Sequence, residues 1–316
     1  TCPCALSLAT PVALTIASGA LARAGLLVTR SHAVETLART THFVFDKTGT
    51  LTEGNFGVTD ILPAAGVSEK ELLMLAYSAE SQSEHPIAKG IVRKGEAEGV
   101  TLLPATDYQN LTGQGLQVTV DGMQVAVVSP GTMDERGIAY DKETFASLAQ
   151  QGKTVVFVLK EGSLQGMIAN ADIIRSSSQE VVAALKEQGI EAIMLTGDNS
   201  RAAQYVGEQL GLAQVFAEVL PAEKSKHIAA LKSGNKKVAM VGDGVNDAPA
   251  LAEADLGIAI GAGTDVAIET ADVILVDSNP KDVLTIITLS KATYRKMVEN
   301  LIWAVGYNII AIPLAA

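Results

Sequence analysis

The sequence predicts an α/β protein that is built on a doubly wound parallel sheet and carries a second, inserted domain. Three short apolar segments, 42–46, 192–198 and 238–243, each end in acidic or hydroxyl residues. Helical patterns at 178–188 and 202–210 accompany the second and third segments. Alternation of short strands and helices is typical of a parallel sheet with helices on both faces. Because ligands bind beyond the carboxyl ends of such strands, we expect the polar strand ends to form one site.

A stretch of different character separates the first of these strands from the second. Residues 58–166 contain helical patterns and strands in which apolar and polar residues alternate. The helical patterns lie at 69–81 and 87–98, and the strands lie at 115–120, 123–128 and 154–160. Alternation with a period of two residues indicates half-buried strands. We therefore expect an α+β domain inserted into the parallel-sheet domain.

Apolar segments near both ends of the chain predict partial transmembrane helices. Basic residues follow the segment 2–21 and precede the segment 301–316, as at the cytoplasmic ends of membrane helices. These basic residues are Arg23, Arg30, Lys291, Arg295 and Lys296. Each segment is short for a full span, and a pair of buried helices in a soluble protein is the alternative. The chain starts at Thr1 and stops inside the second segment, so we expect a fragment of a longer multi-pass protein of a bacterial-type plasma membrane, with cytoplasmic domains.

These patterns divide the chain into five expected segments. A partial transmembrane helix with a cytoplasmic extension occupies 1–29, and a second partial transmembrane helix occupies 291–316. The parallel-sheet domain takes 30–57 and 167–290, and the inserted domain takes 58–166.

Charge and cysteine content exclude several classes of function. The 316 residues carry a net charge of −11 with few aromatic residues and no block of Lys or Arg, which argues against nucleic acid as a partner. Only two cysteines occur, Cys2 and Cys4, so no disulfide framework can join distant parts of the chain. The Gly-rich signature of P-loop nucleotide-binding proteins is absent from the sequence.

Asp46 is the most informative residue of the chain. It ends the apolar strand 42–46, and the sequence Lys-Thr-Gly-Thr-Leu-Thr follows at 47–52. A carboxylate presented at a strand end can attack a phosphoryl group and form an aspartyl-phosphate. A strand followed by an ordinary polar turn is the alternative. The residue types favour a nucleophile at Asp46.

Two further elements are expected to meet Asp46. The Thr196 hydroxyl and the Gly197 backbone N–H follow the second strand, where they could hold phosphoryl oxygens, and Asp198 comes next. Lys224 lies near the start of a helix whose first turn contains a proline. Taken singly, Asp198 could cap a helix and Lys224 could be a solvated helix residue. Their order along the chain favours a shared site.

Carboxylates would crowd this site. Asp243 and Asp247 lie in the Gly-rich run that follows the third strand, and with Asp46 they would surround an anionic phosphate. Two like charges about 4 Å apart repel by about 4 kcal/mol at an effective dielectric constant of about 20. Lys224 supplies one compensating cation, and Mg²⁺ suits the site because it prefers hard oxygen ligands. Catalysis would consist mainly of positioning and charge neutralisation.

The order of these elements resembles that of the haloacid-dehalogenase superfamily. The sequences DKTGT, TGD and GDGVNDAPAL are similar to those of P-type ATPases. The resemblance implies ATP as phosphoryl donor and Mg²⁺ as cofactor. It implies catalytic roles for Asp46, Lys47, Thr48, Thr196, Gly197, Asp198 and Lys224. It also implies a Mg²⁺ site at Asp46, Thr48, Asp243 and Asp247.

The run Ser-Glu-His-Pro at 83–86 resembles the nucleotide-binding motif of heavy-metal-transporting P-type ATPases. The resemblance implies that His85 packs on or near the adenine, that Glu84 bonds to it, and that Gly113 and Gly115 allow close approach. Alone, a His is more often structural, and a Gly-x-Gly is usually a simple turn. The family often has a Gly-Asn pair where this chain has Ser129, so an amide contact to the nucleotide stays open.

Asp172 and Arg175 follow the inserted domain. The family has an Asp and a nearby Arg at this place that link the nucleotide and the hinge. A surface ion pair worth about 0–1 kcal/mol is the alternative.

Cys2-Pro3-Cys4 in the first apolar segment predicts a soft metal site. Proline distorts a helix, and thiolates select Cu(I), with Zn²⁺ as a competitor. Tyr307 and Asn308 resemble the copper-transporting branch, in which a Tyr-Asn pair joins the two cysteines at the transported Cu⁺. No basic residue occurs at 301–316, where zinc and cadmium pumps are expected to carry one. Inert buried thiols and an aromatic residue at a helix interface are the alternatives.

The whole resemblance implies the catalytic fragment of a copper-transporting P-type ATPase. Its partners would be Cu⁺, ATP, membrane lipid and the rest of the pump, namely an actuator domain and further helices; a copper chaperone is a further partner to consider. The Thr-Gly-Glu motif with which the family hydrolyses the acyl-phosphate does not occur in this sequence. Two alternatives stay open: a pump for Zn²⁺ or Cd²⁺, and a soluble haloacid-dehalogenase-like phosphatase without transport.

Overall fold

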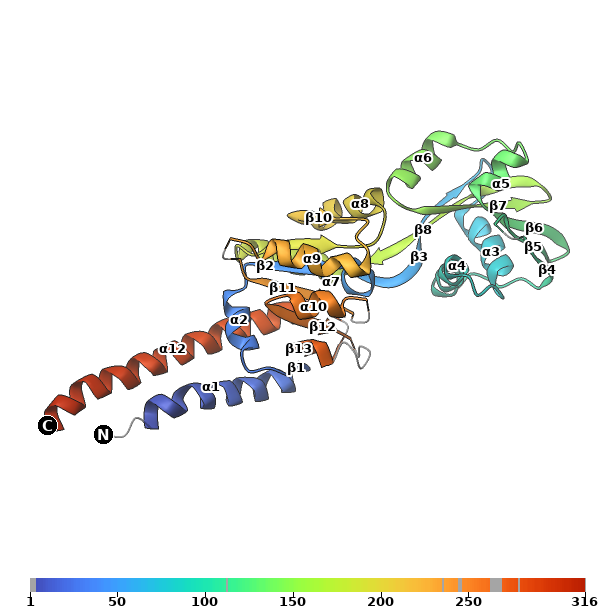
Figure 1. The fold of residues 1–316 in the computed structure, drawn as a ribbon. Helices are drawn as coiled ribbons and strands as arrows, with labels where there is room; N and C mark the ends of the chain where they lie inside the picture. Colours follow the sequence, from blue (N-terminus) through green and yellow to red (C-terminus); the bar gives the residue numbers. More distant parts are fainter. Residues whose placement is uncertain are drawn as a thin grey trace. The chain divides into compact units, whose positions relative to one another are not determined.

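The computed structural model describes residues 4–111, 113–234, 236–243, 246–261, 269–277 and 279–315. The chain forms two compact units (Figure 1). Unit 1 comprises Thr1–Leu51 and Arg175–Ala316, and unit 2 comprises Thr52–Ile174. Unit 2 is therefore inserted into unit 1.

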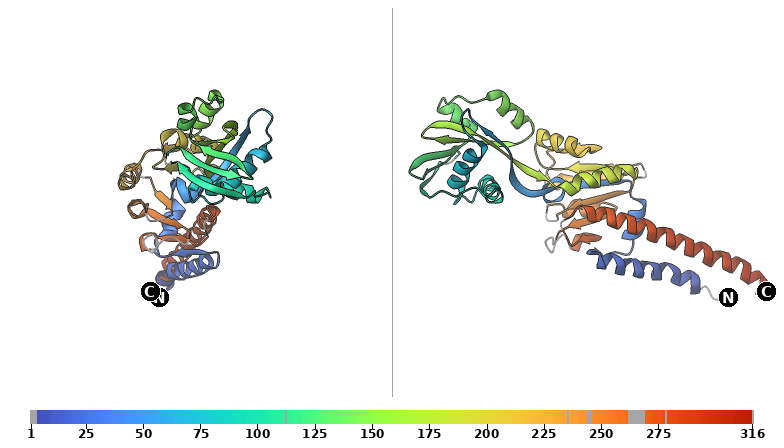
Figure 2. Two further views of the ribbon diagram at one scale, coloured as in Figure 1. Left: turned by 90° about the vertical axis from the view of Figure 1, so that its right-hand side faces the viewer. Right: turned by 180° about the vertical axis from the view of Figure 1, so that it is seen from behind.

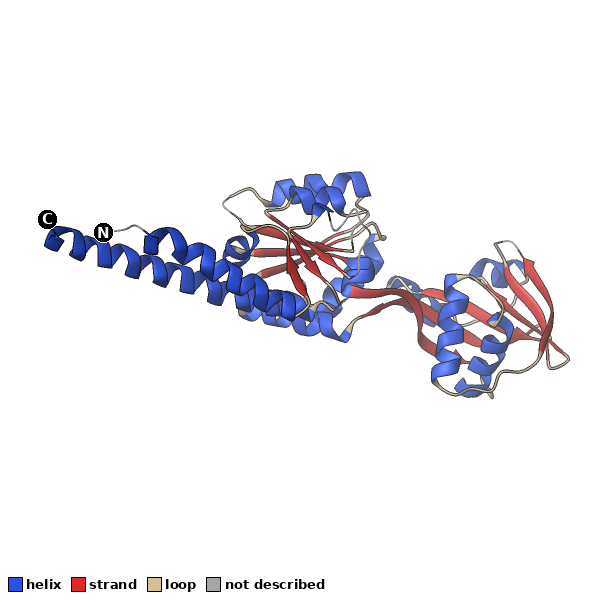
Figure 3. Cartoon of the chain, turned by 90° about the horizontal axis from the view of Figure 1, so that it is seen from below, coloured by secondary structure: helices blue, strands red, loops and turns tan. Residues whose placement is uncertain are grey.

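Unit 1 is built on a seven-stranded sheet with the order β1-β13-β12-β11-β2-β9-β10. Its strands are β1 (Leu26–Val28), β2 (His42–Asp46), β9 (Glu191–Leu195), β10 (Gln214–Phe216), β11 (Val238–Gly242), β12 (Leu256–Ile260) and β13 (Val273–Leu275). All neighbours are parallel except β1, which pairs antiparallel with β13. The central strands β2, β11 and β12 are buried along their whole length. Apolar strands of this kind need cover on both faces, and helices lie on both sides of the sheet (Figure 3).

The helices of unit 1 have local start and stop signals. They are α1 (Cys4–Arg23), α2 (Ala33–Arg39), α7 (Ser176–Glu187), α8 (Ser200–Leu210), α9 (Pro221–Leu231), α10 (Ala248–Glu253) and α12 (Lys281–Ala315). The Asn199 side chain caps α8 by accepting from the Ala202 N–H, and Gly211 ends that helix in the left-handed conformation. Pro221 opens α9, where its missing N–H costs nothing.

Helices α1 and α12 run beside each other (Figures 1 and 2). Both expose large apolar side chains, among them Ile16 in α1 and Trp303 and Ile310 in α12. Among the described residues, no helix has the combination of length and apolar character that crossing a membrane requires. The assignment of 1–29 and 291–316 to a membrane stays a prediction. Instead of starting near residue 291, α12 continues without a break from Lys281.

Unit 2 is an antiparallel six-stranded sheet with the order β3-β8-β7-β6-β5-β4. Its strands are β3 (Thr52–Pro63), β4 (Ala105–Leu111), β5 (Gly115–Val120), β6 (Met123–Val128), β7 (Thr154–Lys160) and β8 (Ser163–Ile174). Helices α3 (Glu69–Glu80) and α4 (Pro86–Ala97) form a core with one face of the sheet. Helices α5 (Pro130–Glu135) and α6 (Lys142–Gln150) flank the other face.

The borders of unit 2 differ from the expected range 58–166. The unit begins at Thr52 and ends at Ile174 because β3 pairs with β8 from Thr52 opposite Ile174 to Pro63 opposite Gly166, with two register shifts. Because β3 and β8 are hydrogen-bonded neighbours in the six-stranded sheet, both strands belong to unit 2. The sequence of β3 does not show this, because apolar and polar residues do not alternate regularly along it.

Candidate functional site

Parallel strand order brings the predicted catalytic residues to one edge of the sheet of unit 1. Strand β2 lies between β9 and β11, and Asp46 is its last residue. The strand ends of β9 and β11 therefore present their polar residues beside Asp46. One pocket is lined by Asp46, Thr48, Thr196, Gly197, Asp198, Val219, Pro221, Lys224, Asp243, Asn246 and Asp247.

Lys224 is the central cation of this pocket. Its Nζ donates to Asp46 Oδ1 at 2.5 Å and to Asp247 Oδ1 at 2.7 Å. All three side chains are buried. Charge-assisted hydrogen bonds of this kind are the strong ones, so Lys224 holds the two carboxylates side by side.

This pocket is lined by more acidic than basic side chains, and the excess shifts pKa values within it. Burial, and after it the charge of Asp247, raise the pKa of Asp46; Asp243 adds to this rise and Lys224 opposes it, and together these effects bring the pKa to about 7. Burial by itself would lower the pKa of Lys224, but Asp46 and Asp247 together outweigh burial and raise that pKa. Lys224 is therefore protonated, while Asp46 becomes a carboxylate only near neutral pH in the absence of a further cation.

The turn Lys47–Leu51 is shaped to approach Asp243 closely. Gly49 has φ +74°, which favours glycine. A Cβ at Gly49 would lie 3.0 Å from Asp243 Oδ2. Beside this turn, Lys47 Nζ forms a 2.5 Å ion pair with Asp198 Oδ2. The predicted catalytic residues Lys47 and Asp198 are thus paired with each other.

Two residues at the start of α7 hold the far side of this turn. Arg175 Nη2 donates to the Gly49 carbonyl oxygen at 3.3 Å, and Ser178 Oγ donates to the Leu51 carbonyl oxygen at 2.8 Å. Arg175, predicted to lie near the nucleotide and hinge, therefore contacts the turn that follows Asp46.

Thr196 is buried at the strand end of β9, and its Oγ1 accepts from the Asp198 N–H at 3.2 Å. Its hydroxyl and Gly197 line the same pocket as Asp46. A hydroxyl that accepts from its own backbone keeps its hydrogen free to point elsewhere, which suits a phosphoryl oxygen as acceptor.

The predicted Mg²⁺ ligands Asp46, Thr48, Asp243 and Asp247 all line this pocket. Within the described part of the chain, no preformed group of three or more acidic, His or Cys side chains surrounds a metal position. Mg²⁺ usually binds through one or two carboxylates and completes its shell with water and phosphate oxygens. The donors are all oxygen atoms, and three of the four residues are carboxylates, so the set fits this ion.

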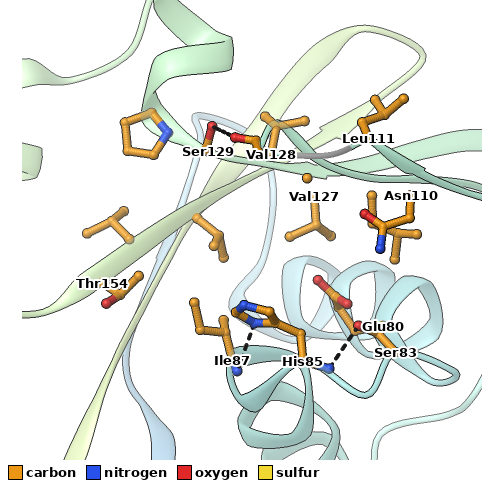
Figure 4. Close-up of a pocket in the computed structure, with 16 residues that line it drawn as sticks. Glu80, Ser83, His85, Ile87, Asn110, Leu111, Val127, Val128, Ser129 and Thr154 are labelled. Carbon is orange, nitrogen blue, oxygen red and sulfur yellow. Dashed lines mark hydrogen bonds between the residues drawn. The ribbon is translucent and has the colours of Figure 1, made fainter.

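A second pocket, of about 310 Å³, lies in unit 2 between α3 and α4 and the facing strands (Figure 4). Its lining is mostly apolar with a few polar groups, as is typical of small-molecule sites. It is lined by Glu80, Ser83, His85, Ile87, Asn110, Leu111, Gly113, Gly115, Leu116, Val127, Val128, Ser129, Pro130, Thr154, Val155 and Val156. We call it the unit 2 pocket.

Local backbone structure explains three of its predicted residues. His85 precedes α4, and its Nδ1 accepts from the Ile87 N–H at 3.3 Å, which fixes the ring at the pocket wall (Figure 4). Gly115 has φ +130°, and a Cβ there would lie 2.1 Å from the Val127 carbonyl oxygen. Gly113 has φ +75° with open space at its Cβ position. Ser129 also lines the pocket, where it caps α5 by accepting from the Thr132 N–H.

Glu80 is the pocket residue that sequence reasoning missed. It is the last residue of α3 and is buried, and burial raises its pKa to about 7, although a hydrogen bond with Ser83 opposes the shift. Glu84, the predicted contact, has an 89 % exposed side chain and pairs with Lys89 at 2.5 Å. It borders a neighbouring, more open pocket together with His85. The sequence shows only an acidic residue at the end of a helical pattern, and its burial becomes visible in the structure alone.

Asp172 joins the two long strands of unit 2. Its Oδ2 accepts from Thr52 Oγ1 at 2.5 Å, and its Oδ1 accepts from the Gly54 N–H at 3.0 Å. This places Asp172 where β3 begins and β8 ends, at the border of the inserted unit.

The family of the chain follows from a comparison with family models. A model described as a hydrolase of the haloacid dehalogenase-like type matches residues 40–255. The chain belongs to the haloacid-dehalogenase-like hydrolases. The match begins just before Asp46 and ends after Asp247, so all the residues predicted to be catalytic lie within it.

Relatives of this hydrolase include metal-transporting P-type ATPases. It is 52 % identical over 316 residues to the copper-exporting P-type ATPase B of Archaeoglobus fulgidus, covering all of this chain and 45 % of the relative. It is 44 % identical over 319 residues to a probable copper-importing P-type ATPase A of Enterococcus hirae, covering all of this chain and 43 % of that relative. The chain thus spans about half the length of the relatives that it matches.

Solved structures agree with this similarity. A zinc-transporting PIB-type ATPase in its E2.Pi state aligns with a TM-score of 0.90 at 38 % identity, over 99 % of this chain and 51 % of that one. The catalytic domain of the CPx-ATPase CopB-B, studied for its changes upon nucleotide binding, aligns with a TM-score of 0.60 at 28 % identity, over 87 % of this chain and 98 % of that one. The hydrolase therefore has the fold of the catalytic region of PIB-type ATPases.

Residues predicted to bind the transported metal are only partly described. Cys2 lies outside the described residues, and Cys4 begins α1. In α12, Tyr307 is exposed, and Asn308 Nδ2 donates to the Ala304 carbonyl oxygen at 2.8 Å within its own helix. Because α1 packs along α12, Cys4 and the predicted ligands Tyr307 and Asn308 lie on neighbouring helices.

Proposed function

We propose that this chain is the ATP-hydrolysing region of a copper-transporting P-type ATPase and that Asp46 is its phosphorylated residue. One observation carries the proposal: a buried strand-end carboxylate is held by Lys224 within a pocket of strand-end Thr, Gly and Asp residues. The named relatives and the inserted unit with a pocket of its own support it.

The proposed reaction transfers the terminal phosphoryl group of ATP to Asp46. A carboxylate oxygen of Asp46 attacks the terminal phosphorus of ATP, and a new oxygen–phosphorus bond forms. The bond from that phosphorus to the bridging oxygen breaks, and ADP leaves with the electron pair. Lys224 orients the carboxylate and favours its ionised form, while Thr196 and Gly197 donate to the oxygens of the transferred group. Mg²⁺ at Asp46, Thr48, Asp243 and Asp247 would neutralise phosphate charge.

The unit 2 pocket is the proposed site for the base of ATP. The carboxylate of Glu80 would accept from the exocyclic amine of adenine, and the imidazole of His85 would pack on the ring. The conformations at Gly113 and Gly115 open the strand side of the pocket and let the ligand approach the backbone. Asp172 and Arg175 are assigned to the border of unit 2 and to the phosphorylated turn rather than to the base.

The proposed cargo is Cu⁺, bound by Cys2, Cys4, Tyr307 and Asn308 within a membrane of the bacterial plasma-membrane type. Thiolate ligands and the names of the copper-transporting relatives support it. A pump for Zn²⁺ or Cd²⁺ is the second candidate, because a zinc-transporting ATPase has a closely similar structure. Membrane lipid, a copper chaperone and the remainder of the pump are the further partners proposed. The names of the copper-transporting relatives include both export and import.

Radiolabelled phosphate transfer tests the catalytic part. The full-length pump, given ATP labelled in its terminal phosphate with Mg²⁺ and Cu⁺, is expected to form an acid-stable phosphoprotein that hydroxylamine cleaves. The variant Asp46→Asn should form none. Persistence of the label in that variant would remove Asp46 as the nucleophile. Release of phosphate from small phosphoesters by the wild type, without label on the protein, would instead favour a phosphatase without transport.

Metal dependence tests the cargo in the same preparation. Cu⁺ is expected to stimulate label incorporation in the wild type and to have no effect in Cys2→Ser or Cys4→Ser, while the affinity for ATP stays unchanged. Stimulation by Zn²⁺ or Cd²⁺ and not by Cu⁺ would replace the copper assignment with the second candidate.

A further inference from the structure

Asn170 is an isolated polar side chain in the interior of unit 2. It lies in β8 with 0 % of its surface exposed. Within the described part of the chain, neither its Oδ1 nor its Nδ2 has a hydrogen-bond partner. Buried amide groups are nearly always hydrogen-bonded, and leaving one unpaired is costly. Both polar atoms of this amide are therefore available to hydrogen-bond with a bound ligand.

The strand register places Asn170 beside the unit 2 pocket. Asn170 pairs with Thr154 of β7, and directly opposite residues of an antiparallel ladder lie on the same face. Thr154 lines the pocket. From the helix side, the Cβ position of Gly90 in α4 lies 3.4 Å from Asn170 Oδ1. Ile87, one turn before Gly90, also lines the pocket, so the amide lies just behind the pocket wall.

The pocket wall along β7 is mostly apolar. Thr154 is flanked along β7 by Val155 and Val156, which line the pocket with apolar side chains. An amide that is both donor and acceptor is satisfied best by a group that also donates and accepts, and a hydroxyl does both. On a nucleotide, the ribose carries such hydroxyls.

The direction of the pocket agrees with a ribose at this end. Thr154 lies across the pocket from Glu80 and Asn110 in Figure 4. If the base occupies the side of Glu80 and His85, the sugar and phosphates extend toward Thr154 and Asn170. Strand β8 leaves unit 2 at Ile174, a few residues after Asn170. The phosphate chain would thus point to the end of unit 2 at which the chain returns to the domain that carries Asp46.

We infer that the Asn170 amide is a hydroxyl-binding subsite of the unit 2 pocket and that it receives a ribose hydroxyl of the bound nucleotide. The inference rests on the proposed function, because it presupposes that this pocket binds ATP. It adds a residue that positions the sugar, deep in the sheet and apart from the base.

Binding of ATP, 2′-deoxy-ATP and 3′-deoxy-ATP to the full chain tests this subsite. The test variant is Asn170→Leu, in which an apolar group of similar volume replaces the unpaired amide; its melting temperature should equal or exceed that of the wild type. Asn170→Ala repeats the measurement with a smaller side chain. Asn110→Ala is the matched control, since it removes an amide from the opposite side of the same pocket.

The wild type should bind ATP about fivefold more tightly than one of the two deoxy analogues, as one net hydrogen bond allows. Both Asn170 variants should bind ATP and that analogue equally, whereas Asn110→Ala should keep the fivefold preference. Retention of the preference in the Asn170 variants, or its absence in the wild type, would overturn the subsite and leave the proposed function intact. Absence of ATP binding by the wild type would overturn both.

Discussion

Lys224 Nζ lies 2.5 Å from Asp46 Oδ1, and this hydrogen bond joins α9 to the end of β2. The same ammonium donates to Asp247, so one cation serves two carboxylates that come from different strand ends. Asp46, the proposed nucleophile, is thus held by an element that lies far from it in the sequence.

Replacement of Lys224 by Met is expected to lower formation of the phosphoenzyme by a factor of about 10²–10³, the range seen when one preorganised charge-stabilising group is lost. The variant also leaves Asp46 and Asp247 buried without their common cation, which should cost about 3–5 kcal/mol of unfolding free energy. Label incorporation and thermal unfolding measure the two effects. Lys226→Met on the exposed side of the same helix is the control and should change neither.

Glu80 predicts a pH dependence of the stability of unit 2. Burial raises its pKa from 4.5 to about 7. A carboxyl whose pKa is higher in the folded than in the unfolded state is most favourable to folding below the unfolded value, and its contribution is lost as the pH rises through the folded value. Relative to Glu80→Gln, the wild type should therefore lose stability between about pH 4.5 and 7, by about 3 kcal/mol in all.

Hydrogen exchange in the peptides of β5 and β6, followed from pH 5 to 8, reports on unit 2 alone. Glu84→Gln serves as the control, because that side chain is exposed, and it should leave the wild-type profile unchanged. An identical pH profile for Glu80→Gln and the wild type would contradict the raised pKa of the buried Glu80 side chain.

Gly115 and Gly113 form a matched pair for testing close backbone approach. Alanine at 115 would place its Cβ 2.1 Å from the Val127 carbonyl oxygen, so we expect loss of nucleotide binding and destabilisation by more than about 2 kcal/mol. Alanine at 113 meets open space and has only its positive φ against it, which costs about 1 kcal/mol. Melting temperatures and ATP titrations measure both; equal behaviour of the two variants would contradict the steric argument.

His85 caps α4, and it is also proposed to bind ATP. Two substitutions distinguish these two roles. His85→Ala removes both the ring and the acceptor that caps α4, whereas His85→Asn keeps an acceptor for the Ile87 N–H. Both should weaken ATP binding about tenfold, but only the alanine variant should lose about 1 kcal/mol of stability. Calorimetric titration and thermal unfolding measure these effects. Normal ATP affinity in His85→Asn would assign the residue to capping alone.

The local pattern of apolar and polar residues correctly predicted several strands, because this pattern follows which side chains are buried. The strand at 42–46 and those at 115–120, 123–128 and 154–160 occur with the predicted bounds, because apolar runs or strict alternation end there at turn residues. Strands β3 and β8 were missed as long partners, since a pairing between Thr52 and Ile174 leaves no trace in either local sequence. The same applies to β12 and β13, which complete the parallel sheet.

The residues of the two candidate pockets were likewise only partly predictable from the sequence. The convergence of Asp46, Lys224 and Asp247 was predictable, because parallel strand ends meet at one edge whatever the loops do. Glu80 and Asn170 were not predictable, because each lies inside an ordinary helical or strand pattern and becomes unusual only through burial by distant residues. Glu80 is buried by tertiary packing whereas Glu84 is exposed, and the sequence motif does not reveal this difference.

The opposed positions of Thr52 and Ile174 mean that the chain enters and leaves unit 2 through a single rung of the ladder. A short peptide could rejoin the two cut ends if this whole unit were excised, and the excised piece would keep its own complete core. The proposed recognition of the base and the proposed transfer of the phosphate would consequently be separable tasks, which makes exchange of unit 2 between related enzymes a realistic engineering route.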